Sequence, residues 1–588
     1  MDSRQIGRDQ AGDAAVDRSF DHANAGGVMA PVHPGVLGQD DQNVGIVGEE
    51  GPTQLLGWRR NGDAEHARIL VGIFANIILR FIIHDIYVAY IPGRLMNTTT
   101  NAIHSTSGSA AAASPSRIPI TIAVGDGIGP EIAAATRLVL AAAAAPLEFH
   151  EVTVGERAYL GGVSSGIPDD AWQAIRTTGV LLKGPITTPQ GGGYKSVNVT
   201  LRKVLGLFAN VRPCASHACV PRSRPGIDLV VVRENEEDLY AGIEHRQTPE
   251  TYQCLKLVTR SGCERIVRYA FAYALANGRR RVTCMTKDNI MKLTDGLFHR
   301  VFDQVAAEHP GIVADHQIID IGAARVATRP EHYDVIVTMN LYGDILSDIA
   351  AEVAGSVGMG GSANIGARAA MFEAVHGSAP DLAGKGVANP SGMLQSAVQM
   401  LVHLGLPHPA ECIHNAWLRT LEDGVLTADL TSSGAVSTSA FAEAVAARLG
   451  QLPQTRAPVA YGASLRIALP DIPPLPAEVR EQVGIDIFLH HVGQPHDLAT
   501  SLLGVVGAGF DMTMITNRGV KVWPDGHPET ICTDHWRCRF MSTGMVAVPF
   551  AQLLALIGRL DAAGFDVIKT EGLFYFAGKP GYSAGQGA

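Results

Sequence analysis

The stretch 118–145, IPITIAVGDGIGPEIAAATRLVLAAAAA, joins an apolar strand to an alanine-rich helix through a glycine turn. Ile118–Val124 predicts a buried strand because its apolar character is nearly continuous, and the alanine-rich run that follows favours a helix. Further short apolar strands, most of them separated by helical segments, are predicted at 179–185, 227–235, 280–287, 332–340 and 367–377. Such alternation is typical of an α/β protein with a largely parallel sheet.

The glycines of the first turn have a spacing of their own. Gly125, Gly127 and Gly129 form G-x-G-x-G and are followed by Pro130. This spacing departs from the dinucleotide fingerprint of Rossmann domains. It therefore predicts a tight strand-to-helix turn and does not by itself identify a dinucleotide site.

Length and composition restrict the class of protein. The chain has 588 residues, of which 46% are hydrophobic and 18% are charged, so large cores are expected and wholesale disorder is excluded. The net charge of −10 argues against a nucleic-acid binder, which normally carries a basic face. Eight cysteines without paired spacing favour reduced thiols, so we expect a cytoplasmic enzyme.

Residues 1–95 differ from the rest of the chain. Their apolar run at 69–91 is long enough to suggest a membrane span, but charged residues interrupt its second half, and charges are costly in hydrocarbon. We expect residues 1–95 to be a non-native extension before a start at Met96, or a disordered leader. A membrane anchor is the less favoured alternative. Residues 96–117, rich in Ser, Thr and Ala, are predicted to be a flexible tail.

The C-terminal part reads as a separate module. Residues 451–476 are predicted to be a linker because they include a stretch rich in Pro and Ala without a sustained period. Residues 477–588 then follow the order β-α-β-β-α-β. This order fits a small ferredoxin-like α+β domain.

A basic cluster begins in the glycine-rich segment 183–212 and continues at the end of the strand 227–235. Arginine offers a planar fork of donors that matches a carboxylate, while Ser and Asn add neutral hydrogen bonds. Converging arginines would suit a polycarboxylate, although each taken singly is typical of a solvated surface charge. The candidate anion-binding residues are Ser196, Asn198, Arg202, Arg212 and Arg233.

An acidic pair lies in the segment MNLYGDILSDIAAEV, 339–353. Asp344 and Asp348 are four residues apart, so on a helix their carboxylates share one face. Like charges this close favour a hard divalent ion with oxygen ligands, Mg²⁺ or Mn²⁺. Asp320 is a candidate third ligand, and an exposed acidic helix face is the alternative.

A loop rich in Gly, Ser, Pro and Asn, FEAVHGSAPDLAGKGVANPSG at 372–392, can approach a ligand closely. His376 and Asn389 are candidates to contact an adenine. Asp381 can accept hydrogen bonds from a ribose hydroxyl and would repel a 2′-phosphate. The alternative is an ordinary surface loop whose polar residues only hold its turns.

Together these segments make residues 118–450 resemble the metal-dependent β-decarboxylating dehydrogenases. The motif GGGYKSVNVTLR at 191–202 is similar to that of the isocitrate dehydrogenases within this family. The tail from 477 resembles the extra C-terminal domain of their longer, Thermus-like bacterial type. The resemblance implies the family's two-domain fold, with parallel and mixed sheets and distinct from a Rossmann fold. The implied large domain is about 118–207 and 355–450, and the implied small domain is about 208–354.

The resemblance also implies an activity, namely the oxidative decarboxylation of isocitrate to 2-oxoglutarate and CO₂ in the tricarboxylic acid cycle. By matching motif positions it assigns isocitrate binding to Ser196, Asn198, Arg202, Arg212 and Arg233. It assigns Mg²⁺ or Mn²⁺ binding to Asp320, Asp344 and Asp348, and catalysis to Tyr240 and Lys287. Lys287 and Asp320 would come from the partner subunit, so a homodimer with shared active sites is implied.

For the coenzyme we expect NAD. Many NADP-dependent relatives carry Lys and Tyr where this chain has Asp381 and Leu382, and the segment 426–438 also lacks the Tyr and Arg that complete a 2′-phosphate site. Arg329 matches a position that can reach the phosphate, so NADP is the alternative. The coenzyme-binding residues implied by the resemblance are Thr187, His376, Gly377, Ser378, Ala379, Pro380, Asp381, Leu382 and Asn389.

Two other functions stay open at this point. One is a homoisocitrate or tartrate dehydrogenase, which would share the metal and the mechanism. The other is a regulatory or assembly protein that acts through the C-terminal module. Phosphorylation of Ser196 would place about two negative charges opposite a substrate carboxylate, as in some relatives.

Overall fold

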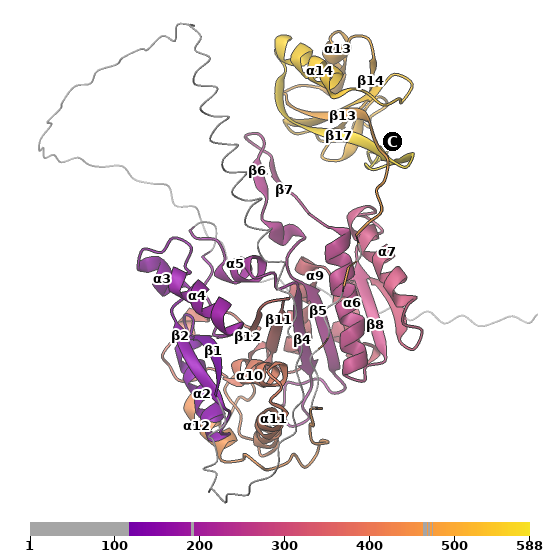
Figure 1. Cartoon of the computed structure of the whole chain (residues 1–588). Coiled ribbons are helices and arrows are strands. Elements are labelled where there is room, and N and C mark those ends of the chain that lie inside the picture. The colour runs from indigo at the N-terminus through magenta and orange to yellow at the C-terminus, as the bar shows by residue number, and fades with distance from the viewer. Residues whose placement is uncertain (1–116, 190–192, 463–466, 468–470, 473, 588) are drawn as a thin grey trace, which may run out of the picture. The chain divides into compact units, whose positions relative to one another are not determined.

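A computed structural model of the chain describes residues 117–189, 193–462, 467, 471–472 and 474–587 (Figure 1). The predictions about residues 1–95, including the apolar run 69–91, lie outside the described residues, as does almost all of the predicted tail 96–117. Across the part that is described, we find no helix with the length and apolar character needed to cross a membrane.

The opening stretch folds as predicted. Strand β1 (Ile118–Ala123) leads into helix α2 (Gly129–Ala142), which has Pro130 in its first turn. Gly125 and Gly127 adopt φ of 78° and 57°, a region that residues with a Cβ enter only at a cost. The glycine turn is therefore confirmed.

The first sheet has ten strands and combines parallel and antiparallel pairing. Their order is β2-β1-β3-β12-β11-β4-β5-β10-β8-β9. Strands at both ends pair in parallel, whereas β12, β11, β4 and β5 pair antiparallel in the middle. The predicted α/β class with a mixed sheet is confirmed. The bounds of the other nine strands are β2 Leu147–Val152, β3 Val180–Lys183, β4 Ala209–Ala215, β5 Asp228–Glu234, β8 Arg281–Thr286, β9 Val313–Ile318, β10 Val335–Thr338, β11 Gly361–Ile365 and β12 Ala370–Ala374.

Helices and short connections follow most of these strands. The remaining helices of this part are α3 Glu156–Leu160, α4 Asp169–Thr178, α5 Val197–Val204, α6 Arg260–Ala276, α7 Thr294–Ala306, α8 Ile319–Thr328, α9 Asn340–Val353, α10 Ser391–His403, α11 Pro407–Glu422 and α12 Thr438–Ala446. Four 3₁₀ turns, η1 Leu239–Ala241, η2 Pro330–His332, η3 Val357–Met359 and η4 Pro380–Leu382, and a small hairpin, β6 Glu244–Arg246 with β7 Tyr252–Cys254, complete it.

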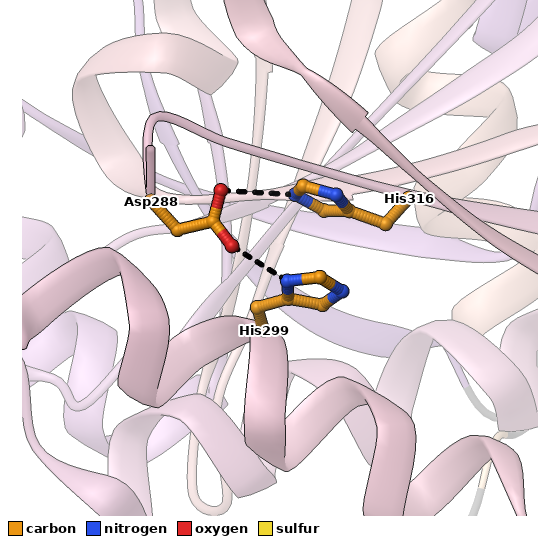
Figure 2. A group of neighbouring side chains, drawn as sticks. All are labelled: Asp288, His299 and His316. Carbon is orange, nitrogen blue, oxygen red and sulfur yellow. Dashed lines mark hydrogen bonds and ion pairs between the residues drawn. The ribbon is translucent and has the colours of Figure 1, made fainter. Parts of the chain in front are cut away.

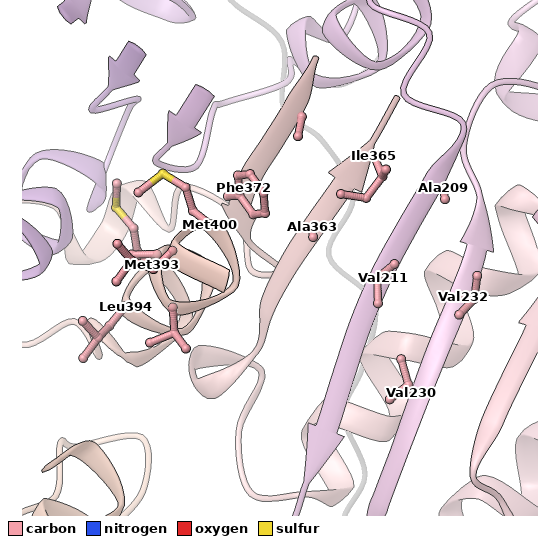
Figure 3. Packing of buried hydrophobic residues seen from close by; sticks show 14 of the residues in the cluster. Ala209, Val211, Val230, Val232, Ala363, Ile365, Phe372, Met393, Leu394 and Met400 are labelled. Carbon is pink, nitrogen blue, oxygen red and sulfur yellow. The ribbon is translucent and has the colours of Figure 1, made fainter. Parts of the chain in front are cut away.

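The core lies between the sheet and its helices. Figure 3 shows Val211 of β4, Val232 of β5 and Phe372 of β12 among buried side chains, with Met393 and Met400 of α10 in the same cluster. Burying each such side chain contributes about 1.5–3 kcal/mol. Strands buried on both faces need continuous apolar runs, which is why β3 and β10 were recognisable from sequence.

The C-terminal module has its own core and its own sheet. Strand order is β15-β14-β16-β13-β17-β18 and every pairing is antiparallel. The predicted β-α-β-β-α-β order is confirmed, and the structure adds the short edge strands β15 and β18. Its elements are β13 Arg480–His490, α13 Pro495–Leu503, β14 Phe510–Asn517, β15 Val520–Trp523, β16 His535–Ser542, α14 Phe550–Ala562, β17 Asp566–Phe576 and β18 Lys579–Pro580.

Candidate active site

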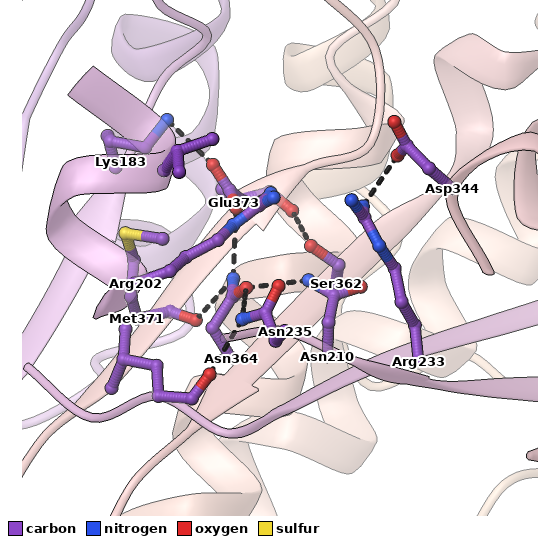
Figure 4. A network of polar contacts seen from close by, with 12 residues as sticks. Lys183, Arg202, Asn210, Arg233, Asn235, Asp344, Ser362, Asn364, Met371 and Glu373 are labelled. Atoms are coloured by element: carbon purple, nitrogen blue, oxygen red, sulfur yellow. Dashed lines mark hydrogen bonds and ion pairs between the residues drawn. The ribbon is translucent and has the colours of Figure 1, made fainter. Parts of the chain in front are cut away.

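A buried ion cluster connects the strands beneath the candidate site. Glu373 of β12 accepts from Lys183 of β3 at 2.8 Å and from Arg202 of α5 at 2.8 Å. Burial by itself would raise the pKa of Glu373, but the two cations hold that pKa well below its usual range. Figure 4 shows the three side chains converging. The cluster therefore fixes the position of Arg202, a predicted substrate residue.

Three asparagines extend this network across the sheet (Figure 4). Asn364 donates to Glu373 at 3.0 Å, and its own carbonyl oxygen accepts from Asn210 at 2.6 Å and from Asn235 at 3.1 Å. Asn210 in turn accepts from Arg212 Nε at 2.7 Å. Buried hydrogen-bond networks of this kind rigidify their surroundings, and here Oδ1 of Asn235 is left without a partner among the described residues.

Two of the predicted substrate arginines meet at Asp344 of α9. Its Oδ1 lies 2.5 Å from Arg233 Nη1 and 3.3 Å from Arg212 Nη1. Arg233 is fully buried and is held from the other side by Asn340, at 2.7 Å from Nη2 to Oδ1. Burial would raise the pKa of Asp344, but both arginines lower it, so this side chain is a carboxylate.

Tyr240 completes this group of side chains. Its hydroxyl donates to Asp344 Oδ2 at 2.5 Å, and the Arg233 guanidinium lies 4.9 Å from the centre of its ring. Burial and the nearby carboxylate of Asp344 raise the pKa of Tyr240. The phenol is therefore protonated at neutral pH and can act as a proton donor.

The predicted metal ligands Asp344 and Asp348 share one face of α9. The Asp348 side chain is 58% exposed and lies 3.3 Å from Arg212 Nη1. Two carboxylates one turn apart, one of them open to solvent, fit the oxygen-donor chemistry of Mg²⁺ or Mn²⁺. The residues present therefore fit such an ion.

Asp320, the third predicted ligand, pairs with Lys287 instead. Asp320 lies in the first turn of α8, and Lys287 Nζ donates to it at 2.9 Å. Among the described residues, one group of three or more metal-ligating side chains brings its ligand atoms within 4.8 Å of one another, and it includes none of the three predicted aspartates. Within one chain, then, Asp320 and Lys287 form a pair separate from Asp344 and Asp348. Their supply by a partner subunit stays a prediction.

The start of α5 presents the other predicted substrate residues. Ser196 is the N-cap of this helix, and its Oγ accepts from the Val199 backbone N–H at 3.4 Å. Within the described parts of the chain, the buried Oδ1 of Asn198 and Nε of Arg202 have no hydrogen-bond partner. A buried polar atom without a partner costs free energy, so these atoms are suited to bind a ligand.

The predicted coenzyme loop is fastened to the first glycine turn. The Thr187 hydroxyl lies 2.9 Å from that of Ser378, and Ile128 N–H donates to the Ser378 carbonyl at 2.9 Å. A Cβ on Gly127 would lie 2.0 Å from this same carbonyl oxygen. Asp126 accepts from the Thr187 N–H at 3.0 Å. Gly127 is therefore required for the close approach of the two loops.

The rest of this loop divides into exposed and internally bonded residues. Asp381 and Leu382 are exposed on η4, whereas Nε2 of His376 is buried without a partner among the described residues. Asn389 is buried, and its side chain is already used: Nδ2 donates to Asp429 at 3.0 Å and Oδ1 accepts from Ser391 N–H at 2.9 Å. Asn389 thus shapes the loop with both ends of its amide. Gly377, Ala379 and Pro380 lie on the same loop.

Sequence reasoning did not select several residues that hold the site together. They are Asp126, Lys183, Asn210, Asn235, Asn364, Glu373 and Asp429. Two of them could have been found from the sequence, because each is a charged residue in an apolar strand. Lys183 ends the strand VLLK, and Glu373 lies inside the strand AMFEA. A charged residue within a fully buried strand indicates a buried partner.

A cavity of about 420 Å³ lies apart from this site. Its lining includes Tyr269 and Tyr273 of α6 and Trp417 of α11, together with His217 and His414. None of the predicted substrate, metal, catalytic or coenzyme residues lines it.

Comparison with known proteins gives two family matches. Residues 119–445 match the model "Isocitrate/isopropylmalate dehydrogenase", and residues 480–588 match "Bacterial isocitrate dehydrogenase, C-terminal domain".

Relatives that are similar to this chain over most of its length are named isocitrate dehydrogenases. "Isocitrate dehydrogenase [NADP]" of Rickettsia typhi is 50% identical over 477 residues, covering 80% of this chain and 99% of the relative. The protein of the same name from Thermus thermophilus is 46% identical, and the match covers 80% of this chain and 95% of that relative. "Isocitrate dehydrogenase [NAD] subunit 2, mitochondrial" of Saccharomyces cerevisiae is 44% identical, and the match covers 57% of this chain and 91% of that relative.

Solved structures agree in fold. The crystal structure of a Thermus thermophilus protein matches with a TM-score of 0.76 at 45% identity, covering 80% of this chain and 96% of that one. The isocitrate dehydrogenase of Methylococcus capsulatus matches with a TM-score of 0.55 at 44% identity, covering 57% and 99%.

Proposed function

Because this chain belongs to the isocitrate/isopropylmalate dehydrogenase family, we propose that it oxidises and decarboxylates isocitrate to 2-oxoglutarate and CO₂ with a nicotinamide dinucleotide. The observation that carries the proposal is the meeting of Arg212, Arg233 and Tyr240 at the carboxylate of Asp344. Cations for the substrate, a proton donor and a candidate metal ligand thereby lie within contact distance of one another.

Binding and orientation fall to the arginines and to the start of α5. The guanidinium groups of Arg212 and Arg233 would hold isocitrate carboxylates through charge-assisted hydrogen bonds. Two buried atoms that have no partner within the described part of the chain would also contact the substrate: Arg202 Nε would donate to a carboxylate, and Asn198 Oδ1 would accept from the hydroxyl. Because Glu373 and Asn340 already fix two of these arginines, little side-chain entropy is lost on binding.

Proton transfers fall to Lys287 and Tyr240. Lys287 of the partner subunit, as a neutral amine, would accept the 2-hydroxyl proton and become an ammonium, while a hydride leaves C2 for the nicotinamide. The product of that step is a β-keto acid, which loses CO₂. Tyr240 would then donate its phenolic proton to C3 of the resulting enolate, giving 2-oxoglutarate.

Asp344 and Asp348, with Asp320 of the partner subunit, would hold the divalent ion. When bound, that ion supplies charge stabilisation for the developing alkoxide and enolate oxygens. Asp344 would also keep the Tyr240 hydroxyl oriented through the hydrogen bond already formed.

For the coenzyme we propose NADP, which is the coenzyme in the names of the bacterial relatives at 46% and 50% identity. The NAD preference inferred from Asp381 finds no support in those names, although the exposed carboxylate makes NAD the second candidate. Lys385 is exposed on the same loop. Its backbone N–H donates to the Leu382 carbonyl at 3.2 Å, and its side chain is not used in that bond. Its ammonium is a candidate partner for the 2′-phosphate.

Steady-state turnover of isocitrate with Mg²⁺ tests these proposals. We expect 2-oxoglutarate as product and a higher kcat/KM with NADP⁺ than with NAD⁺. Lys385→Met should then lower kcat/KM for NADP⁺ at least about tenfold and leave that for NAD⁺ nearly unchanged. A higher kcat/KM with NAD⁺ would favour the second candidate, and turnover of homoisocitrate or tartrate in preference to isocitrate would refute the proposed substrate.

A further inference from the structure

We propose that Asp288, His299 and His316 form a second metal site, which takes a borderline transition-metal ion such as Zn²⁺. One ligand atom from each residue lies within 4.8 Å of the other two, and all three side chains are half-buried. The site shares no residue with the proposed active site.

The three ligands come from three different elements (Figure 2). Asp288 follows β8, His299 lies on α7 and His316 lies on β9. The Asp288 carboxylate faces both imidazoles, at 2.7 Å from His299 Nδ1 and 3.9 Å from His316 Nε2. The fold therefore brings an oxygen and two nitrogen donors close together, although Asp288 and His316 are 28 positions apart in sequence.

The two imidazoles are stacked beside the Asp288 carboxylate, so one ring must turn before both nitrogens can bind a single ion in their ring planes. Their ring centres are 3.6 Å apart at an interplanar angle of 18°. Neutral imidazole is the form that binds metal, and one carboxylate would balance half the charge of a divalent ion.

The donor set also selects the class of metal. Imidazole nitrogen suits Zn²⁺, Co²⁺ or Ni²⁺, whereas Mg²⁺ and Mn²⁺ favour sites made only of oxygen, such as Asp344 with Asp348. At a Zn–N distance of about 2.0–2.1 Å, tetrahedral ligand atoms lie about 3.4 Å apart. Binding would therefore shorten a widest separation of 4.8 Å by about 1.4 Å and lengthen the 2.7 Å contact of Asp288 with His299. Asp303 lies 3.7 Å from the second nitrogen of His299 and could orient that ring.

Such an ion would fasten the segment after β8 to α7 and β9. Asp288 directly follows Lys287, whose ammonium pairs with Asp320. A metal bound at Asp288 would therefore restrict the backbone that carries this lysine. We assign the ion a structural role, because it would cross-link the segment after β8, helix α7 and strand β9 through three protein ligands.

Two measurements on the full chain test the proposal. The protein is first freed of metal and saturated with Mg²⁺, and Zn²⁺ binding is then followed by titration calorimetry and by X-ray absorption. We expect one Zn²⁺ per chain that Mg²⁺ does not displace, with imidazole scattering around the zinc. An all-oxygen site would show no such scattering. We also expect the melting temperature to rise with Zn²⁺, because the metal binds the folded state.

Variants identify the ligands. His299→Gln and His316→Gln should each weaken Zn²⁺ binding at least about tenfold and abolish the Zn²⁺-dependent rise in melting temperature. His150→Gln, on the exposed strand β2, is the matched control and should change neither. Binding that stays the same in both ligand variants, or zinc with only oxygen neighbours, would overturn the proposal. Because every readout is independent of turnover, the result does not depend on the proposed activity.

Discussion

Lys183 and Glu373 stand opposite each other in the parallel pair of β3 and β12, with Nζ and Oε2 2.8 Å apart and both side chains almost completely buried. Arg202 shares the same carboxylate at 2.8 Å. Arg202, a predicted substrate residue, is thus held by a buried cluster of charged side chains. We expect substitutions of Lys183 or Glu373 in this cluster to be poorly tolerated.

Glu373→Gln tests this dependence. Removing one partner of a buried ion pair leaves uncompensated charge, and the expected loss in the free energy of unfolding is about 3–5 kcal/mol. Urea denaturation measures it. Glu151→Gln, which removes the exposed pair of Arg137 and Glu151, should cost less than about 1 kcal/mol. Equal effects of the two changes would contradict the role given to the buried cluster.

The proposed sharing of active sites between subunits predicts complementation. Tyr240→Phe and Lys287→Met homodimers should each lose about 10²–10⁴-fold in kcat. A co-expressed, separately tagged heterodimer of the two has one site with both wild-type residues, so its kcat should recover to about half of the wild-type value. Tyr252→Phe, at an exposed tyrosine of β7, is the control and should keep full activity. No recovery in the heterodimer would show that Tyr240 and Lys287 act within one chain.

The N-cap position of Ser196 allows charge and helix stability to be separated. Both Asp and Asn are good N-cap residues, so Ser196→Asp and Ser196→Asn should unfold within about 0.5 kcal/mol of the wild type. The added carboxylate would repel isocitrate, so only Ser196→Asp should raise KM, by at least about tenfold. An equal rise in both variants would point to shape rather than charge. The same charge effect is what phosphorylation of Ser196 would produce.

Gly127 should control coenzyme binding. An alanine there would need φ of 57° and would place its Cβ 2.0 Å from the Ser378 carbonyl oxygen, so the coenzyme loop must move. We expect Gly127→Ala to raise KM for the coenzyme more than KM for isocitrate. Gly162→Ala, at φ of 98° with no atom within 4 Å of the added Cβ, carries the backbone strain without the clash. Comparing the two in steady-state kinetics isolates the effect of the loop contact.

Two histidines beside Trp417, the buried His217 and the half-buried His414, predict how stability depends on pH. Burial, reinforced by Arg456, lowers the pKa of His217 to about 3 and that of His414 to about 4. Their unfolded pKa is about 6.5, so the unfolded chain binds their protons first as pH falls. The free energy of unfolding should therefore be highest above pH 6.5 and fall by about 1.4 kcal/mol per pH unit per histidine down to pH 4.

Urea denaturation at pH 7, 6 and 5 checks this slope. His217→Gln should flatten it by about 1.4 kcal/mol per pH unit, because one titrating group is removed. The exposed His150 is the control position, and His150→Gln should leave the slope unchanged. A slope that His217→Gln does not alter would mean that other groups govern the acid range.

The order of many elements and the placement of the acidic pair on one helix face were determined by the sequence alone. Mostly apolar runs marked β1, β3 and β10, because strands covered on both faces need apolar side chains at most positions. The spacing of Asp344 and Asp348 placed both on one helix face, because the helical repeat is local. The six-element order of the C-terminal module was likewise predictable from local patterns.

Contacts between distant segments were decided only by the tertiary structure. Lys183 meets Glu373 because β12 pairs with β3 in one particular register, and no local pattern specifies that pairing. For the same reason Asp126 reaches Thr187, and Asn389 donates to Asp429. The order of strands in the sheet sets which side chains share a neighbourhood, and that order depends on long-range packing of the whole chain.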